Sequence, residues 1–129
     1  MPLELAYGSR DRFLAEPLAG VDIAISLRDR RLLRPLAATV AELAARPIED
    51  EKRDLWYRHN DLEATRPLVF CDLEYGWNEV FPPGVLQCEG NLARQWELIL
   101  RKEVFWGTEL LDDAVLRPYE RDIDAGFIH

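Results

Sequence analysis

One short apolar run constrains the fold of this chain more than any other feature. Residues 66–72 read Arg-Pro-Leu-Val-Phe-Cys-Asp. Val69 and Phe70 favour a β-strand, and apolar residues at successive positions indicate a strand that is buried on both faces. Pro67 is tolerated as the first residue of a strand. Because such a strand needs neighbouring strands, and the chain offers few, we expect a sheet that is incomplete within these 129 residues.

Helical patterns dominate the rest of the chain. Residues 22–34 are weakly helical, and after Pro35, which suits a first helical turn, Leu36 begins an apolar stripe with period i, i+4, i+7 and i+8. Pro47 should stop this helix near Arg46. A second helix is expected over residues 49–60, where three acidic residues occupy the first turn.

The strongest helical pattern covers residues 91–106. Its broad apolar stripe consists of Leu92, Trp96, Ile99 and Leu100. Asn91 or Glu89 can cap the start of this helix, and Gly107 should end it.

The chain therefore reads as a single segment that is mainly α with one or two short strands. Its predicted parts are an irregular lead (1–21), helices (22–66), a strand (67–72), a loop (73–90), a helix (91–106) and a tail (107–129). Short helical turns are expected around Trp77 to Phe81 in the loop.

The charge pattern restricts the partners of the chain. The net charge is −8, and residues 49–129 carry eighteen acidic against nine basic groups. This surface repels nucleic-acid phosphates and anionic membranes, so neither partner is expected. The apolar runs are too short for a membrane span and the N-terminus does not resemble a signal peptide, which favours the cytoplasm.

The cysteines and histidines do not suggest a metal site or a catalytic centre. Cys71 and Cys88 lack the spacing of a zinc site or a disulfide framework, so we predict no metal ligand in this chain. Cys71 has no histidine placed to activate it, and His59 fits a packed imidazole on a helix face. Asp112 and Asp113 are adjacent, so capping or solvent exposure accounts for them better than a catalytic pair.

Several motifs together resemble the uroporphyrinogen decarboxylase-like superfamily. The series begins with Leu55-Trp56, Asn60-Asp61-Leu62 and Arg66-Pro67 before the apolar run. It continues through Trp77-Asn78-Glu79, Leu86-Gln87-Cys88-Glu89, Trp96-Glu97-Leu98 with Leu100-Arg101, and Asp112-Asp113 with Arg117-Pro118-Tyr119. The similarity follows the order of the family's motifs from about Leu36 to Tyr119.

The resemblance implies a (β/α)8 barrel, of which this chain would supply the helical lead-in and the first strand. The superfamily contains porphyrinogen decarboxylases, and methyltransferases that use zinc and a corrinoid or thiol methyl carrier. The decarboxylase signature Arg-Gln-Ala-Gly-Arg is replaced here by residues 71–76, Cys-Asp-Leu-Glu-Tyr-Gly, which favours a methyltransferase parent. The zinc ligands of the methyltransferases lie late in the barrel, beyond this chain, so we expect no cofactor in the chain itself.

The same resemblance marks four candidate substrate-binding residues, because strand ends in barrel enzymes face the active-site mouth. They are Asp72, Glu74, Trp77 and Glu79. The simpler interpretation makes Asp72 a cap for the following turn, Trp77 a core residue and the two glutamates solvated side chains. No residue is assigned a catalytic role.

Two functional hypotheses remain open at the level of sequence. In the first, the chain is the N-terminal portion of a barrel enzyme, inactive alone, and its partner is the remainder of the barrel or a second chain. In the second, it is a self-standing helical domain whose apolar face binds another protein or a second copy of itself, without catalysis. The first hypothesis predicts an in-frame continuation with a His-x-Cys motif and a later Cys.

Overall fold

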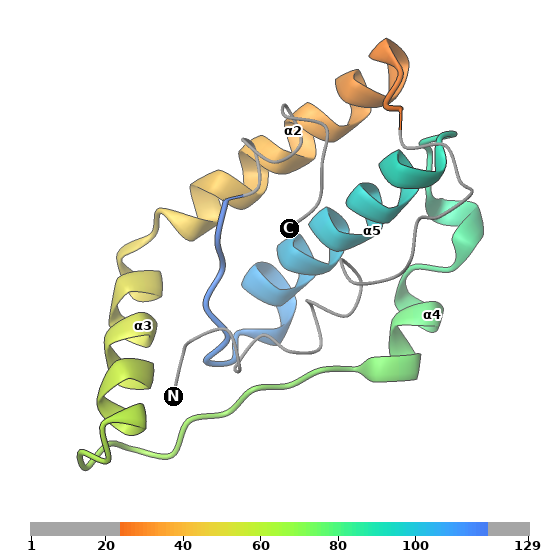
Figure 1. The fold of residues 1–129 in the computed structure, drawn as a ribbon. Helices are drawn as coiled ribbons and strands as arrows, with labels where there is room; N and C mark the ends of the chain where they lie inside the picture. Colours follow the sequence, from red (N-terminus) through yellow and green to blue (C-terminus); the bar gives the residue numbers. More distant parts are fainter. Residues whose placement is uncertain (1–23, 119–129) are drawn as a thin grey trace.

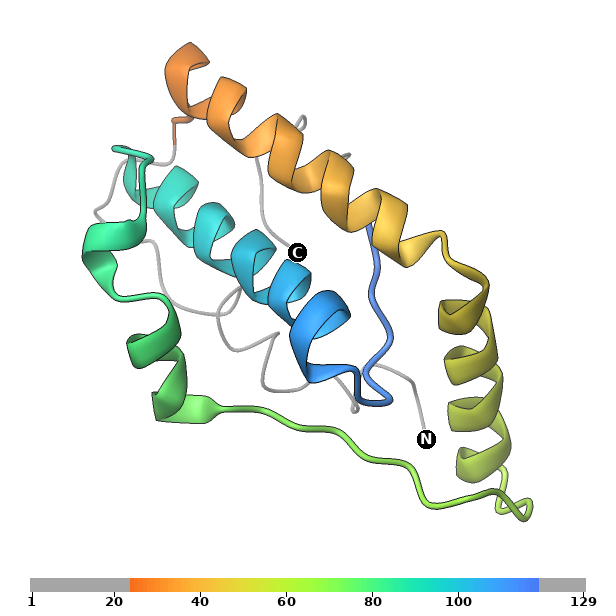
Figure 2. The same cartoon turned by 180° about the vertical axis from the view of Figure 1, so that it is seen from behind.

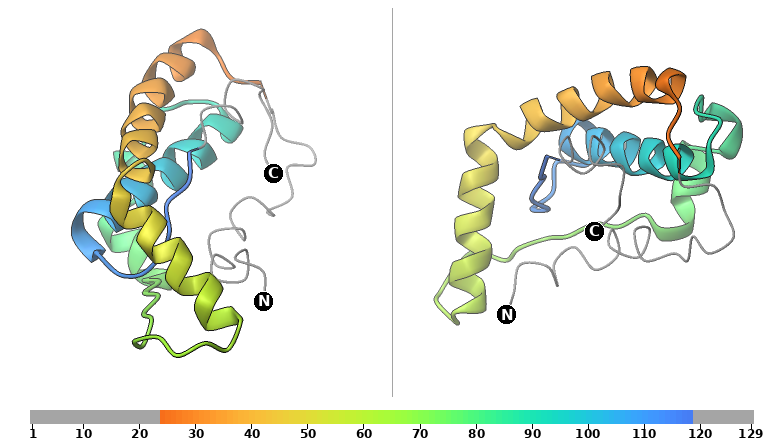
Figure 3. Two further views of the ribbon diagram at one scale, coloured as in Figure 1. Left: turned by 90° about the vertical axis from the view of Figure 1, so that its left-hand side faces the viewer. Right: turned by 45° about the horizontal axis from the view of Figure 1, so that its top comes forward.

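The computed structural model describes residues 24–118, and the regular structure in this range is helical. Two long helices, α2 (Leu27–Ala44) and α5 (Asn91–Phe105), lie side by side with their N-termini at the same end (Figure 1). Helix α3 (Pro47–Asn60) follows α2 after a sharp bend and runs in a different direction (Figure 3). The mainly helical prediction is therefore confirmed.

Shorter elements return the chain from α3 to α5. Residues 61–73 form a long connection that leads to the 3-10 turn η2 (Glu74–Gly76), as Figure 2 shows. The helical turn α4 (Trp77–Val80) and the 3-10 turn η3 (Pro83–Val85) follow, and α5 continues into a π-helical turn, η4 (Trp106–Leu110). Helical turns were expected around Trp77 to Phe81, and α4 confirms them. The predicted lead (1–21) and the end of the tail lie outside the described residues.

The interface between α2 and α5 forms the larger of two apolar cores. Its buried members are Leu33, Ala37, Val40, Cys88, Leu92, Ala93, Trp96, Ile99 and Leu100. The stripe predicted for residues 91–106 is buried at all four positions, because each helix turns one apolar face toward the other. The second core contains Trp77, Trp106, Ala114 and Leu116, with further aromatic residues packed around them.

A buried carboxylate, Asp29, joins the N-termini of the two long helices. Its amide donates to the hydroxyl of Ser26, the N-cap of α2, at 3.1 Å. Its carboxylate accepts hydrogen bonds from the amides of Glu89 and Gly90, which precede α5 (3.1 and 2.9 Å). The expected cap from Asn91 or Glu89 is therefore wrong: the cap residue is Gly90, and α2 supplies the carboxylate. This position also places the negative carboxylate near the positive ends of both helix dipoles, which is favourable.

Pro35 does not begin a helix, contrary to expectation. It lies inside α2, which starts eight residues earlier at Leu27 behind the cap of Ser26. Proline cannot donate to the carbonyl one turn back, so an internal proline weakens a helix. Here the burial of Leu33, Ala37 and Val40 against α5 holds the helix together on both sides of the exposed Pro35.

Helix α3 follows the prediction, and Pro47 occupies its first turn. One face of α3 holds the backbone of residues 113–116. The Oε1 atom of Glu49 accepts from the Leu116 amide (2.8 Å), Lys52 donates to the carbonyl of Ala114 (2.8 Å), and the Trp56 indole donates to the carbonyl of Asp113 (2.7 Å). Glu49 and Lys52 are also joined by a 2.7 Å ion pair. Side chains thus replace a neighbouring strand for this segment.

The predicted strand over residues 67–72 is wrong, because here too side chains rather than a neighbouring strand bind the backbone. No strand forms within residues 24–118, although this segment runs extended from α3 toward η2 (Figure 2). Its backbone pairs with carboxylates: the Val69 amide donates to Asp113 (2.7 Å), and the Cys71 amide donates to Asp112 (2.6 Å). Only one backbone-to-backbone bond joins the two segments, from the Asp113 amide to the Val69 carbonyl. Apolar composition alone could not distinguish this arrangement from a sheet.

Helix α5 ends at Phe105, within one residue of the prediction, but the chain does not leave its helical path at Gly107 as expected. Gly107 lies buried inside the π-helical turn η4, which closes at Leu111, whose φ of 52° is left-handed. Position 107 favours glycine because a larger side chain would collide with its neighbours. An added Cβ would lie 2.7 Å from Cδ1 of Leu116 and 3.1 Å from Cδ1 of Leu43.

The substitution Gly107→Ala should therefore destabilise the fold by about 1–3 kcal/mol, the usual cost of overpacking a core. Gly84→Ala is the matched control, because a Cβ there meets nothing within 4 Å. We expect it to change stability by less than about 1 kcal/mol. Chemical denaturation of both variants measures the difference. Equal midpoints for the two variants would show that the core around Gly107 yields freely.

Candidate functional site

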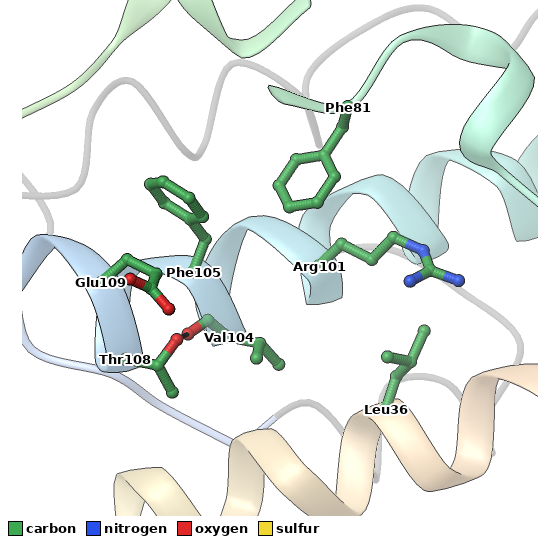
Figure 4. Close-up of a pocket in the computed structure, with 7 residues that line it drawn as sticks. All are labelled: Leu36, Phe81, Arg101, Val104, Phe105, Thr108 and Glu109. Carbon is green, nitrogen blue, oxygen red and sulfur yellow. Dashed lines mark hydrogen bonds between the residues drawn. The ribbon is translucent and has the colours of Figure 1, made fainter. Parts of the chain in front are cut away.

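A shallow groove lies where α2, α5 and the chain after α4 meet. Its volume is about 180 Å³. The lining residues are Leu36 from α2, Phe81 after α4, Arg101, Val104 and Phe105 from α5, and Thr108 and Glu109 from η4 (Figure 4). The sequence places residues 101, 104, 105 and 108 on one helix face, because they are separated by three or four positions.

Stacked aromatic rings form one wall of the groove. Phe81 and Phe105 meet edge to face, with ring centroids 6.1 Å apart. Behind them, Trp77 lies nearly parallel to Phe81 at 6.2 Å and edge-on to Phe105 at 5.6 Å. The Trp77 indole N–H donates to Asp72 at 2.7 Å, which fixes the orientation of the ring. The wall is therefore both apolar and rigidly held.

Two polar groups of the groove, those of Arg101 and Thr108, are already engaged in hydrogen bonds. The guanidinium of Arg101 binds Glu97 through Nε and Nη2, each 2.8 Å from Oε2. Burial raises the pKa of the Glu97 carboxyl, but hydrogen bonds from the Cys88 and Gln87 amides and from Arg101 outweigh it, so the net shift is downward. Thr108 donates to the Val104 carbonyl at 2.7 Å. The groove suits an apolar group, with the Glu97-paired guanidinium of Arg101 and the exposed carboxylate of Glu109 among its lining groups.

The four candidate substrate-binding residues have different positions. Asp72 and Trp77 are brought together, and Trp77 is buried behind the groove wall rather than open to a ligand. Asp72 also accepts from the Glu74 amide at 3.1 Å, which makes it a cap for the turn at η2. Glu74 and Glu79 are exposed and do not line the groove. The geometry of all four matches the simpler interpretation, and their role toward a substrate stays a prediction.

Lys102 is a buried cation that sequence reasoning missed. Its side chain is almost fully buried, with Nζ 5.3 Å from the centroid of the Trp77 ring. Burial lowers the pKa of Lys102 to about 8, and the Asp72 carboxylate opposes this shift. An aromatic face and a carboxylate together stabilise an ammonium group in an apolar setting. The only sequence signal was a lysine beside the apolar stripe of α5.

The substitution Lys102→Met should stabilise the protein at pH 7 by about 1–3 kcal/mol, because it removes the cost of burying a charge. The direction in which stability changes with pH follows from the lowered pKa of Lys102. Between pH 8 and 10.5 the unfolded chain binds more protons at this site, so the stability of the unsubstituted protein should rise and the advantage of the variant should shrink. Denaturation curves across this pH range measure both effects, and Lys102→Arg is the charge-retaining control. An advantage that is constant with pH would contradict burial of the charge as its cause.

The cysteines and His59 do not form a reaction centre. Burial, reinforced by the nearby Glu97 and Asp29, raises the pKa of the Cys88 thiol to about 12, so it remains protonated. His59 is exposed and touches Trp56 edge to face at 5.9 Å. Within residues 24–118, no three His, Cys, Asp or Glu side chains are placed to hold a metal ion. Nor does any helix of this range have the length and apolar character of a membrane span.

A second hollow, of about 350 Å³, lies at the shared N-termini of α2 and α5. Its walls include Ala24, Ile25, Ser26, Asp29, Glu89 and Gly90. Both oxygens of Asp29 accept hydrogen bonds from the backbone of residues 89–90. The carboxylate is therefore committed to joining the helices.

The aromatic groove is thus a candidate binding surface in the described part of the chain. Comparisons of the sequence and structure with protein-family models, curated proteins and solved structures found no match.

Proposed function

We propose that this chain is the N-terminal helical portion of an enzyme of the uroporphyrinogen decarboxylase-like superfamily, and that it is inactive alone. The parent enzyme is proposed to transfer methyl groups with a corrinoid or thiol carrier. Porphyrinogen decarboxylation is the weaker proposal, because residues 71–76 replace the family's arginine-rich signature.

One observation carries this proposal: residues from several of the resembling motifs contact one another. Trp56 and Arg66 both bind Asp113, through its carbonyl and its carboxylate respectively. The neighbouring Asp112 accepts from the Cys71 amide. Matches that are scattered over the sequence are thus connected in space. This connection favours a shared local fold over a chance series of short matches.

The proposed role of the chain in the parent is to cover one end of the barrel and contribute an apolar wall to the substrate pocket. Phe81 and Phe105 form the wall, and Arg101 supplies a cation beside it. The described residues provide no ligand set for zinc, so the proposal assigns the metal ligands to the later part of the parent.

The test begins with the gene. We expect an in-frame continuation beyond the codon of His129 that encodes a His-x-Cys motif and a later Cys. The full-length product should bind zinc and transfer a methyl group between a methylated corrinoid and a thiol. In that product, Phe81→Ala should raise KM more than it lowers kcat, whereas Val85→Ala, at an exposed site outside the groove, should change neither. A stop codon directly after His129 would overturn the proposal.

The alternative, a self-standing interaction domain, is favoured by a different observation. Large apolar side chains that do not line the groove are exposed: Leu62 at 93%, Tyr75 at 87% and Leu111 at 70%. Single exposed apolar residues are common on proteins, so these three positions do not outweigh the connected motifs.

A further inference from the structure

The charges in and behind the aromatic groove do not balance. Two charged residues line the groove, Arg101 and Glu109. The guanidinium of Arg101 is paired with the buried carboxylate of Glu97 at 2.8 Å, so these two charges compensate each other. Behind the aromatic wall, the carboxylate of Asp72 compensates the ammonium of Lys102. One charge of the groove is left over, and it belongs to Glu109.

The carboxylate of Glu109 is exposed, and within residues 24–118 it has no hydrogen-bond or ion-pair partner. Figure 4 shows it at the end of the groove that Phe105 and Thr108 form, with the guanidinium of Arg101 pointing away from that end. Positions 105 and 109 are four residues apart, so both side chains lie on the same side of the helical path. The groove therefore presents one uncompensated negative charge beside an aromatic ring.

An aromatic wall beside a free carboxylate favours a positively charged ligand. A cation is attracted both by the face of an aromatic ring and by the carboxylate. An anion would be repelled by Glu109, and the guanidinium of Arg101 would not attract it strongly because Glu97 already neutralises that charge. The net charge of −8 adds a long-range attraction for cations.

The size of the groove limits the ligand to a small molecule. Its volume of about 180 Å³ is smaller than the pockets of about 300–1,000 Å³ that hold drug-sized ligands. It is close to the cavity of about 150 Å³ that is known to hold one benzene ring. The apolar contacts for such a ring come from Leu36, Phe81, Val104 and Phe105. One ring with a short chain therefore matches the space.

We propose that the groove binds small organic cations, with an aromatic ring of the ligand against Phe81 and Phe105 and its protonated amine beside Glu109. The wall is held in place by Trp77, which contacts both phenylalanine rings, so little ordering is needed when the ligand binds. This inference rests on the proposed function only in treating the groove as a ligand site. It does not require the proposed enzymatic parentage.

Two probes of similar shape and opposite charge test the proposal. At pH 7, 2-phenylethylamine is a cation and 3-phenylpropionate is an anion, and both carry one ring on a short chain. Each is titrated into the full 129-residue chain, and NMR amide shifts measure its affinity. The cation should bind in the millimolar range and shift the amides of residues 104–109. The anion should bind about fivefold more weakly or less, because Glu109 repels it.

Three variants separate the local charge from the other contributions. Glu109→Gln should weaken binding of the cation about threefold, the effect of losing one exposed ion pair, and should remove most of the preference over the anion. Glu51→Gln removes the same net charge at an exposed site of α3 outside the groove, and should leave both affinities unchanged. Phe81→Leu should weaken both probes, because it removes an aromatic ring from the wall. Circular dichroism verifies that each variant is folded.

Equal affinities of the two probes, or an unchanged affinity for the cation in Glu109→Gln, would overturn the proposal. An equal loss in Glu51→Gln would also overturn it, because the attraction would then come from the net charge alone. So would shifts that do not saturate or that map outside the groove. None of these results depends on the gene beyond the codon of His129, so a failure here is distinguishable from a failure of the proposed parentage.

Discussion

The substitution Glu49→Ala is expected to destabilise the protein by about 3–5 kcal/mol, the usual cost of breaking a buried ion pair from one side. The Glu49 side chain is completely buried, and it binds Lys52 at 2.7 Å, Arg46 at 3.3 Å and the Leu116 amide at 2.8 Å. Alanine would leave the buried ammonium of Lys52 and the amide of Leu116 without this partner. Because residues 113–116 rest on these contacts, that segment should loosen first.

A matched control lies one residue away on the same helix. Asp50 pairs with Arg53 at 2.9 Å, but its side chain is 80% exposed. Asp50→Ala should therefore cost less than about 1 kcal/mol. Urea denaturation followed by circular dichroism compares the two variants, and native-state hydrogen exchange locates the loss. Similar midpoints would mean that burial adds nothing to the Glu49 contacts.

A loss of similar size is expected for Trp96→Ala, about 3–5 kcal/mol from lost burial and the cavity left behind. Trp96 is completely buried at the centre of the α2–α5 interface, among Leu33, Val40 and Leu92. Thermal denaturation should show the loss as a much lower Tm.

Tyr75→Ala is the control for removing an aromatic side chain. Tyr75 is 87% exposed, so its truncation should change stability by no more than about 0.5 kcal/mol. If Trp96→Ala left Tm close to that of Tyr75→Ala, the helix interface would not be the main source of stability.

Helix boundaries could be predicted where a local signal and the apolar period agreed. Pro47 was expected to stop the helix before it, and α2 ends at Ala44, while the period of four apolar residues marks α5 to within one residue. Pro35 and Gly107 misled the prediction, because each was interpreted by its usual local role. Packing against a distant segment decided both positions: α5 holds α2 straight through Pro35, and Leu116 needs the space at Gly107. Contacts between residues so far apart in the sequence produce no local sequence pattern.

The candidate site was predictable only in part. Asp72 and Trp77 were singled out separately as candidates, and the structure joins them through the hydrogen bond from the Trp77 indole to Asp72, which the sequence did not predict. The groove residue Arg101 was missed, because nothing in the sequence indicates that Glu97, one turn away, is buried and fixes it. Buried charges of this kind depend on the loop of residues 86–88 folding back over α5, as Glu97 binds the amides of Gln87 and Cys88.

The long separation in sequence between the Asp29 carboxylate and the amides that it binds has a consequence during synthesis. Asp29 leaves the ribosome 60 residues before the first amide that it binds. At a synthesis rate of about 5–20 residues per second, about 3–12 s pass between the synthesis of Asp29 and the synthesis of the residues that begin α5. Throughout that interval its Leu33, Ala37 and Val40 face has no α5 to cover it. Nascent chains that end before α5 should therefore bind a chaperone that recognises exposed apolar surface more strongly than chains that extend beyond it.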